Sequence, residues 1–236
     1  MKTPKTSQPT RHLQRGFTLT ELLVVIAIIA VLASLAFMAT RKIRDSASAA
    51  VDASDLRTIG ASVMLYASDN NILPTTSGGV GPEFNSSSNS LSGALAPYLG
   101  YEDLPDGTFM PEFAAASWQN EKAGDNGPSL LVMHRVYSGN GTPSSLSRPD
   151  PCFLPFGYPF GDAKRDGMTL EGAISTMGDP SNRLMLTEID RLHPNFKSST
   201  PSWLDTVPEK MAHGSYRLGL YWDGHVSRLD VDLNAF

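Results

Sequence analysis

Cysteine is nearly absent from this sequence, since the 236 residues contain only Cys152. A single thiol cannot form an intramolecular disulfide, so the fold must depend on a hydrophobic core or on bound ions. Basic residues are also scarce, with 19 Lys and Arg against 24 Asp and Glu and a formal net charge of -5. This balance argues against a broad basic surface that neutralises nucleic-acid phosphates. We therefore expect no nucleic-acid partner.

Sequence motifs of enzymes are missing as well. The chain contains no P-loop, HExxH, nucleophile elbow, CxxC pair or complete dinucleotide fingerprint. Its length leaves room for one globular domain beside a membrane segment. We therefore interpret the protein as a non-enzymatic, single-domain protein and expect no catalytic residue.

Helix-breaking residues are almost missing between residues 17 and 73, where Gly60 is the only glycine and no proline occurs. This absence predicts one long helix that ends near Asp69, before Asn71 and Pro74. The last part of the helix carries an apolar stripe at helical spacing, which we expect to pack on a sheet. The stripe consists of Leu56, Ile59, Val63 and Tyr66.

The first part of this helix is a long apolar run. From Phe17 to Met38 the residues are apolar or small, with the exception of Glu21. A helix of this length rises about 33 Å, enough to cross the hydrocarbon core of a bilayer. A carboxylate in hydrocarbon costs about 2.5 to 3.5 kcal/mol, so Glu21 implies a partner within the membrane.

Three other interpretations of the run stay open. A secretory signal peptide has small residues before its cleavage site, and Ser34 and Ala36 fit that pattern. Its apolar core is usually only 7 to 15 residues long, however. An uncleaved anchor and the buried helix of a soluble protein are the other two, and Glu21 suits neither. Positive charges flank the run on both sides and give no orientation.

The residues around the start of the run resemble the N-terminal signature of type IV prepilins and type II secretion pseudopilins. The signature consists of a basic segment with Lys2, Lys5, Arg11 and Arg15, then Gly16, Phe17, Thr18, Leu19 and Glu21. The resemblance implies cleavage after Gly16 by a prepilin peptidase and N-methylation of Phe17. It also implies that Glu21 pairs with the N-terminal amine of a neighbouring subunit during assembly.

The resemblance also implies an arrangement of the chain. Residues 1–16 are the basic leader, 17–39 the transmembrane and polymerisation helix, 40–69 the periplasmic half of that helix, and 70–236 the globular head. The N-terminus would lie in the cytoplasm and the head outside the inner membrane. Residues 17–236 carry a formal charge of -9, because the four basic residues of the leader have no acidic counterpart.

The head reads as a small antiparallel sheet with a loop-rich insertion. Strands are predicted over Leu130–Tyr137 and Arg183–Ile189, and short helical turns over Ala94–Gly100 and Thr169–Ser175. In the insertion, Phe153, Phe156, Tyr158 and Phe160 either cover a small core or form a platform for a ligand. With the N-terminal helix, the whole is an α+β, pilin-like fold.

Residues 213–232 read as a hairpin that begins with a second motif. The pair Asp223-Gly224 predicts a two-residue turn, which would place Arg217 opposite Asp230. His213 followed after nine residues by Asp223 and Gly224 resembles the H-x9-DG motif at the C-terminus of many prepilin-like proteins. His213, Asp223 and His225 include donors that bind zinc, but we interpret Asp223 as a turn residue with local hydrogen bonds.

Calcium is the one cofactor that the sequence leaves open. Asp230, Asp232 and Asn234 repeat the spacing at the start of a calcium-binding loop, and major pseudopilins bind calcium near their C-terminus as a family. The glycine and distal glutamate of such a loop are missing here. We interpret these residues as solvated acids at the end of a strand, with no cofactor.

These observations favour a structural function. The chain is expected to be processed by the prepilin peptidase and to assemble with other subunits into a type II secretion pseudopilus or a type IV pilus-like filament. The alternative is an anchored extracytoplasmic domain that uses the leader only for export and binds a ligand or carbohydrate. In that case head aromatics such as Trp118, Tyr158 or Trp222 would contact the ligand.

Overall fold

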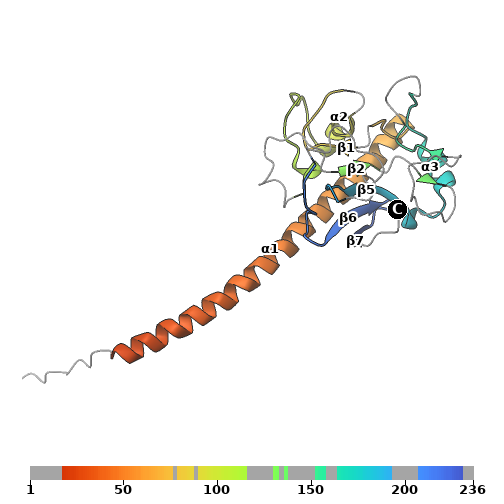
Figure 1. Cartoon of the computed structure of the whole chain (residues 1–236). Coiled ribbons are helices and arrows are strands. Elements are labelled where there is room, and N and C mark those ends of the chain that lie inside the picture. Colours follow the sequence, from red (N-terminus) through yellow and green to blue (C-terminus); the bar gives the residue numbers. More distant parts are fainter. Residues whose placement is uncertain are drawn as a thin grey trace, which may run out of the picture. The chain divides into compact units, whose positions relative to one another are not determined.

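The computed structural model describes residues 18–76, 79–87, 90–115, 130–132, 136–137, 152–157, 164–192 and 207–230. Contacts within the chain divide it into two compact units, residues 1–44 and 45–236. One helix, α1 (Leu19–Asn70), contributes to both. The larger unit combines the second part of α1 with antiparallel strands and short helices, so the α+β, pilin-like fold is confirmed (Figure 1).

Helix α1 agrees with its prediction in extent and in its buried face. Leu56, Ile59 and Val63 are at most 2% exposed. Gly60 lies on the same helix, and a Cβ atom added there would come within 2.9 Å of the Leu220 side chain. The helix therefore packs closely on the strand that contains Leu220. It ends at Asn70, and the next residue, Asn71, has a φ of 59°, the left-handed conformation that asparagine tolerates.

The main sheet has five antiparallel strands in the order β1-β2-β5-β6-β7. A second sheet pairs β3 with β4. The strands are β1 (Gly79–Val80), β2 (Leu130–Val132), β3 (Val136–Tyr137), β4 (Cys152–Phe153), β5 (Leu184–Glu188), β6 (Tyr216–Tyr221) and β7 (Val226–Asp230). The prediction of a single strand over Leu130–Tyr137 was wrong, because its two ends belong to different sheets. The predicted strand over Arg183–Ile189 is confirmed as β5.

The β6–β7 hairpin differs from its prediction by one residue of register. Leu220 pairs with Val226, and Arg217 pairs with Leu229 rather than with Asp230. The loop has three residues, Trp222 to Gly224, because the Tyr221 amide donates to the carbonyl of His225. Gly224 takes the left-handed conformation that closes such a loop, with φ 87°. An Asp-Gly pair alone does not distinguish this loop from a two-residue turn.

Short helices surround the sheet. They are α2 (Leu91–Leu95), α3 (Leu170–Met177), and the 3-10 turns η1 (Ala96–Leu99), η2 (Pro111–Phe113) and η4 (Pro180–Asn182). Both predicted helical turns are thereby confirmed, Ala94–Gly100 as the end of α2 with η1 and Thr169–Ser175 as α3. Both α2 and α3 begin with a hydroxyl cap, since Ser90 accepts from the Gly93 amide and Thr169 from the Gly172 amide.

The chain that follows α1 is held by the segment before α3. The Leu73 amide donates to the Met168 carbonyl at 2.7 Å, and the Thr76 amide to the Phe156 carbonyl at 3.2 Å. Phe156 is fully buried and its ring centroid lies 5.4 Å from that of Trp222. Phe156 therefore covers the core, as one of the two interpretations held, and Tyr158 and Phe160 lie outside the described residues.

Candidate functional site

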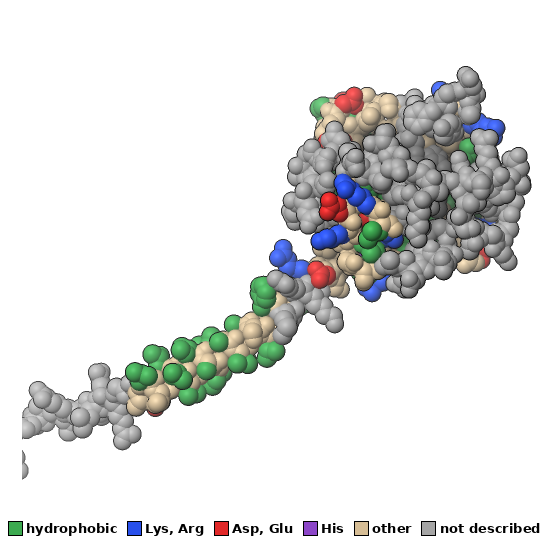
Figure 2. All heavy atoms as spheres, viewed as in Figure 1, with side chains coloured by type: hydrophobic (Ala, Val, Ile, Leu, Met, Phe, Trp, Pro, Cys, Tyr) green, Lys and Arg blue, Asp and Glu red, His purple; other side chains and the backbone are tan. Residues whose placement is uncertain are grey.

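The first part of α1 exposes apolar surface along its length. Residues Leu19–Phe37 have a mean hydropathy of 2.6, and none of this segment is buried within the chain. Figure 2 shows its side chains as a nearly continuous hydrophobic covering of the helix. The helix is long and apolar enough to cross a membrane. Surface of this kind requires lipid or other apolar helices around it.

Glu21 forms a capping box at the start of α1. Its Oε2 atom accepts hydrogen bonds from the Thr18 amide at 2.8 Å and from the Thr18 hydroxyl at 2.7 Å. In return, the Glu21 amide donates to the Thr18 hydroxyl oxygen at 3.3 Å. This reciprocal pair satisfies amides at the helix N-terminus. The T-x-x-E spacing in the sequence is the signal that could have revealed it, and it gives Glu21 a local function besides any role in assembly.

Comparison with known families decides what kind of N-terminus this is. The model of the prokaryotic N-terminal methylation motif matches residues 11–37, the segment that contains Gly16, Phe17 and Glu21. The chain has a prepilin-type N-terminus. Neither the search of the curated proteins nor the search of the solved structures found a match to the chain.

This prepilin-type N-terminus indicates the class of the protein, its attachment to a membrane and its processing. It indicates a processed subunit of the pilin or pseudopilin type, anchored in a membrane through its apolar helix. It implies processing by a prepilin peptidase and assembly with other subunits. Gly16 and Phe17 lie outside the described residues, so cleavage after Gly16 and methylation of Phe17 stay predictions.

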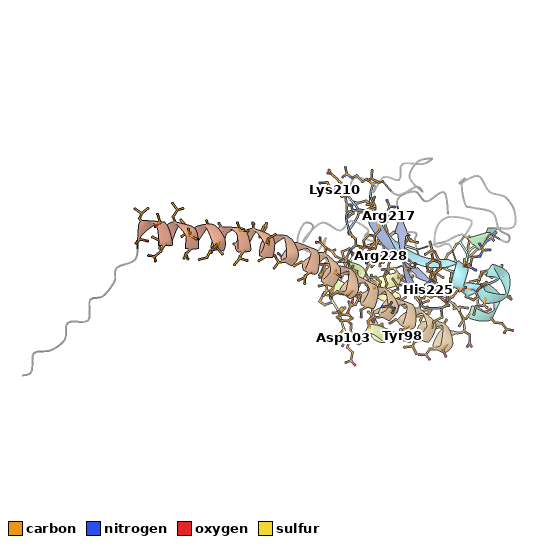
Figure 3. All side chains as sticks on the ribbon, turned by 90° about the horizontal axis from the view of Figure 1, so that it is seen from below. Tyr98, Asp103, Lys210, Arg217, His225 and Arg228 are labelled. Atoms are coloured by element: carbon orange, nitrogen blue, oxygen red, sulfur yellow. The ribbon has the colours of Figure 1, made fainter. Side chains whose placement is uncertain are left out.

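The structure separates the members of the H-x9-DG motif. His213 lies just before β6, whereas Asp223 and Gly224 lie in the loop at the other end of that strand. The Asp223 carboxylate binds the amide and the Nδ1 atom of His225, at 3.1 and 2.6 Å. These hydrogen bonds, first that from the amide, lower the pKa of Asp223. Figure 3 places His225 at the opposite end of the hairpin from Arg217 and Arg228.

His213 instead meets two acids from distant parts of the chain. Its Nε2 atom lies 3.0 Å from Glu188 Oε1 at the end of β5 and 3.3 Å from Asp52 Oδ2 on α1. The three side chains are 1 to 3% exposed. We call Asp52, Glu188 and His213 the His213 cluster. One donor atom of each residue lies within 4.8 Å of the other two.

Neighbouring groups fix the orientation of the His213 cluster. The Leu218 amide donates to Glu188 Oε2 at 2.7 Å, which leaves Oε1 to face His213. The imidazole stacks on Tyr216 with ring centroids 5.0 Å apart. Arg228 lies over the same tyrosine ring, 4.6 Å from its centroid. Glu188 and His213 are therefore each held in one direction.

The two carboxylates of the His213 cluster favour positive charge on the imidazole. Burial is the largest influence on the pKa of His213 and lowers it. The hydrogen bond to Glu188 and the charges of Glu188 and Asp52 outweigh burial, so the pKa is raised above its usual value. The nearby Arg228 acts in the opposite direction. The raised pKa thus reflects the two carboxylates beside the ring.

The sequence indicated His213 but not its partners. Asp52 precedes the buried stripe by four residues and so extends the same helix face as Leu56, Ile59 and Val63. An acid on that face was the available signal for a polar group under the sheet. Glu188 gave a similar signal, as an acid at the end of a strand that begins with three apolar residues.

Only one of the three residues of the possible calcium site belongs to the described part of the chain. The backbone of Asp230 ends β7, while Asp232 and Asn234 lie outside the described part of the chain. Trp222, named as a ligand-contacting residue in the alternative function, is 4% exposed and belongs to the core. Trp118 and Tyr158 lie outside the described residues.

Proposed function

We propose that this protein is a pilin-like or pseudopilin subunit that polymerises into a type II secretion pseudopilus or a type IV pilus-like filament. One observation carries the proposal: the methylation motif coincides with an apolar helix that buries none of its surface within its own chain. Before assembly the lipid of the inner membrane would cover this surface. In the filament the same helix of neighbouring subunits would replace the lipid.

Glu21 is the residue through which the subunits would be aligned. It is the one acidic residue between Thr18 and Met38. An ion pair with the methylated amine of a neighbouring Phe17 would neutralise it only in the correct register. Buried ion pairs add little net stability but can specify one arrangement among several. The charge is thus proposed to select the assembled geometry.

The capping box allows the charge of Glu21 to be tested apart from its hydrogen bonds. Glutamine can replace glutamate in a capping box, so Glu21→Gln keeps the cap and removes the charge. Thr18→Val removes the hydroxyl hydrogen bonds of the cap and keeps the charge. We expect Glu21→Gln to be cleaved normally and to be absent from sheared or purified filaments, and Thr18→Val to be incorporated. The measurements are immunoblots of the processed chain and of the filament fraction.

Normal incorporation of Glu21→Gln would contradict the alignment role and reduce Glu21 to a helix cap. Mass spectrometry of the N-terminal peptide from native membranes tests the processing step itself. We expect a chain that begins at N-methylated Phe17. A chain that begins at Met1, or near Phe37, would contradict the whole proposal. A methylated chain that never enters filaments would favour the anchored binding domain instead.

A further inference from the structure

The His213 cluster is explained neither by the membrane helix nor by filament assembly. It lies entirely within the larger unit and joins α1, β5 and the start of β6. We propose that Asp52, Glu188 and His213 bind a divalent transition-metal ion, with Zn²⁺ as the best fit, as a structural link between the helix and the sheet. This inference does not depend on the proposed function.

The first argument is that both carboxylates approach the same ring nitrogen. A single Nε2–H group can direct its hydrogen towards one acceptor, yet Glu188 Oε1 and Asp52 Oδ2 lie 3.0 and 3.3 Å from that atom. All three donor atoms lie within 4.8 Å of one another, close enough to share one ion. In a tetrahedral zinc site with bonds of 2.0 to 2.2 Å, the ligand atoms are separated by about 3.3 Å. The two distances to Nε2 are close to that value.

The second argument is charge. The carboxylates of Asp52 and Glu188 carry two negative charges at 1 to 2% exposure, and a protonated imidazole supplies only one positive charge. A divalent ion with a neutral imidazole balances both carboxylates. Two guanidiniums do not change this balance: Arg217 forms two hydrogen bonds with Asp190, and the nearby Arg228 is exposed and lies over the Tyr216 ring. Buried charge of one sign is costly, so the divalent ion is the better match.

The third argument is the type and support of the ligands. Imidazole and carboxylate together suit zinc and its neighbours, whereas calcium prefers six to eight oxygen ligands. Ligands in metal sites are typically held by outer hydrogen bonds and packing. Here the Leu218 amide holds Glu188, and Tyr216 stacks on His213. The deep burial of all three side chains favours a structural ion over one that meets a substrate.

The test uses the full chain, purified in detergent, stripped with a chelator and then titrated with Zn²⁺. We expect one Zn²⁺ per chain by elemental analysis and a higher unfolding temperature that a chelator reverses. Asp52→Asn and His213→Gln should each weaken Zn²⁺ binding by about 100-fold or more, measured by competition with a chromophoric chelator. His225→Gln is the matched control, because His225 forms an exposed pair with Asp223 2.6 Å away. It should bind Zn²⁺ like the wild type.

Wild-type protein without stoichiometric Zn²⁺, or His213→Gln that binds as tightly as the wild type, would overturn the proposal. Loss of binding in His225→Gln would point to adventitious surface binding and overturn it equally. If the cluster variants do not fold, the wild type alone decides through X-ray absorption of its bound zinc. One imidazole with oxygen ligands supports the site, and two or more imidazoles, or none, contradict it.

Discussion

At the scale of single residues, Arg217 and Asp190 show how charge is accommodated in the head. Both side chains have no exposed surface, and the guanidinium Nε and Nη2 atoms donate to the two oxygens of the carboxylate. In the backbone register Arg217 pairs with Leu229 and not with Asp230, the partner predicted from the sequence. A bidentate pair of this kind is weak evidence of net stability, but each member depends on the other.

Replacing Arg217 by Met should therefore destabilise the head strongly. The change leaves Asp190 buried without its counter-charge, which costs about 3 to 5 kcal/mol of unfolding free energy. Arg228→Met is the control, since Arg228 is exposed and its guanidinium lies over one face of the Tyr216 ring. It should cost less than about 1 kcal/mol. Urea unfolding of both variants measures the difference, and equal losses would show that the buried pair has no special weight.

Asp55 predicts a pH dependence of stability. Burial, and then the negative charge of Glu112, raise the pKa of Asp55 above its usual value. At pH values between the pKa of Asp55 in the unfolded state and its higher pKa in the folded state, the folded protein binds more protons. The stabilising contribution of Asp55 is therefore present at lower pH and is lost as the pH rises through its pKa in the folded state. Asp55→Asn should then stabilise the protein at pH 7 by a few tenths of a kcal/mol and not at pH 3.

Thermal unfolding at the two pH values tests this expectation. Asp45→Asn serves as the control, because Asp45 is an exposed acid on the same helix. It should shift the unfolding temperature by the same small amount at both values. An Asp55→Asn variant that gains as much stability at pH 3 as at pH 7 would contradict the stated cause.

At the scale of secondary structure, periodicity predicted α1 well because one physical requirement determines it. Leu56, Ile59 and Val63 share a face, and that face is buried on the sheet. Short strands gave weaker signals. β1 has two residues, and β2 and β3 are interpreted from sequence as one strand because Leu130–Tyr137 is rich in β-forming residues. Only pairing with distant strands separates them, and pairing is not visible in a local pattern.

The packing of α1 predicts a difference between its two faces. Ile59→Ala removes a side chain with no exposed surface and should cost about 2 to 5 kcal/mol. Leu65→Ala on the same helix removes a side chain that is 54% exposed and should cost less than about 1 kcal/mol. Chemical denaturation of the two variants in the same detergent gives the comparison. Similar losses would mean that the stripe is not the main contact between helix and sheet.

At the scale of the whole molecule, the N-terminal motif could be predicted from the sequence, whereas the His213 cluster could not. The N-terminal motif is local, so residues 11–37 suffice to identify it. The His213 cluster is not local, because Asp52, Glu188 and His213 come from a helix, a strand and a loop that adjoin only in the fold. Acids are rarely buried, so neither Asp52 nor Glu188 was expected in the interior of the head. Sequence reasoning found the histidine and missed its environment.

The distribution of the His213 cluster along the chain bears on how the protein is made. Asp52 leaves the ribosome early, Glu188 much later, and His213 only with the last hairpin. Until then the two carboxylates lack their shared basic partner, and burying them is unfavourable. A product that ends before the hairpin cannot complete its interior and stays accessible to proteases. The interior of the head is thus complete only after the last hairpin has been made.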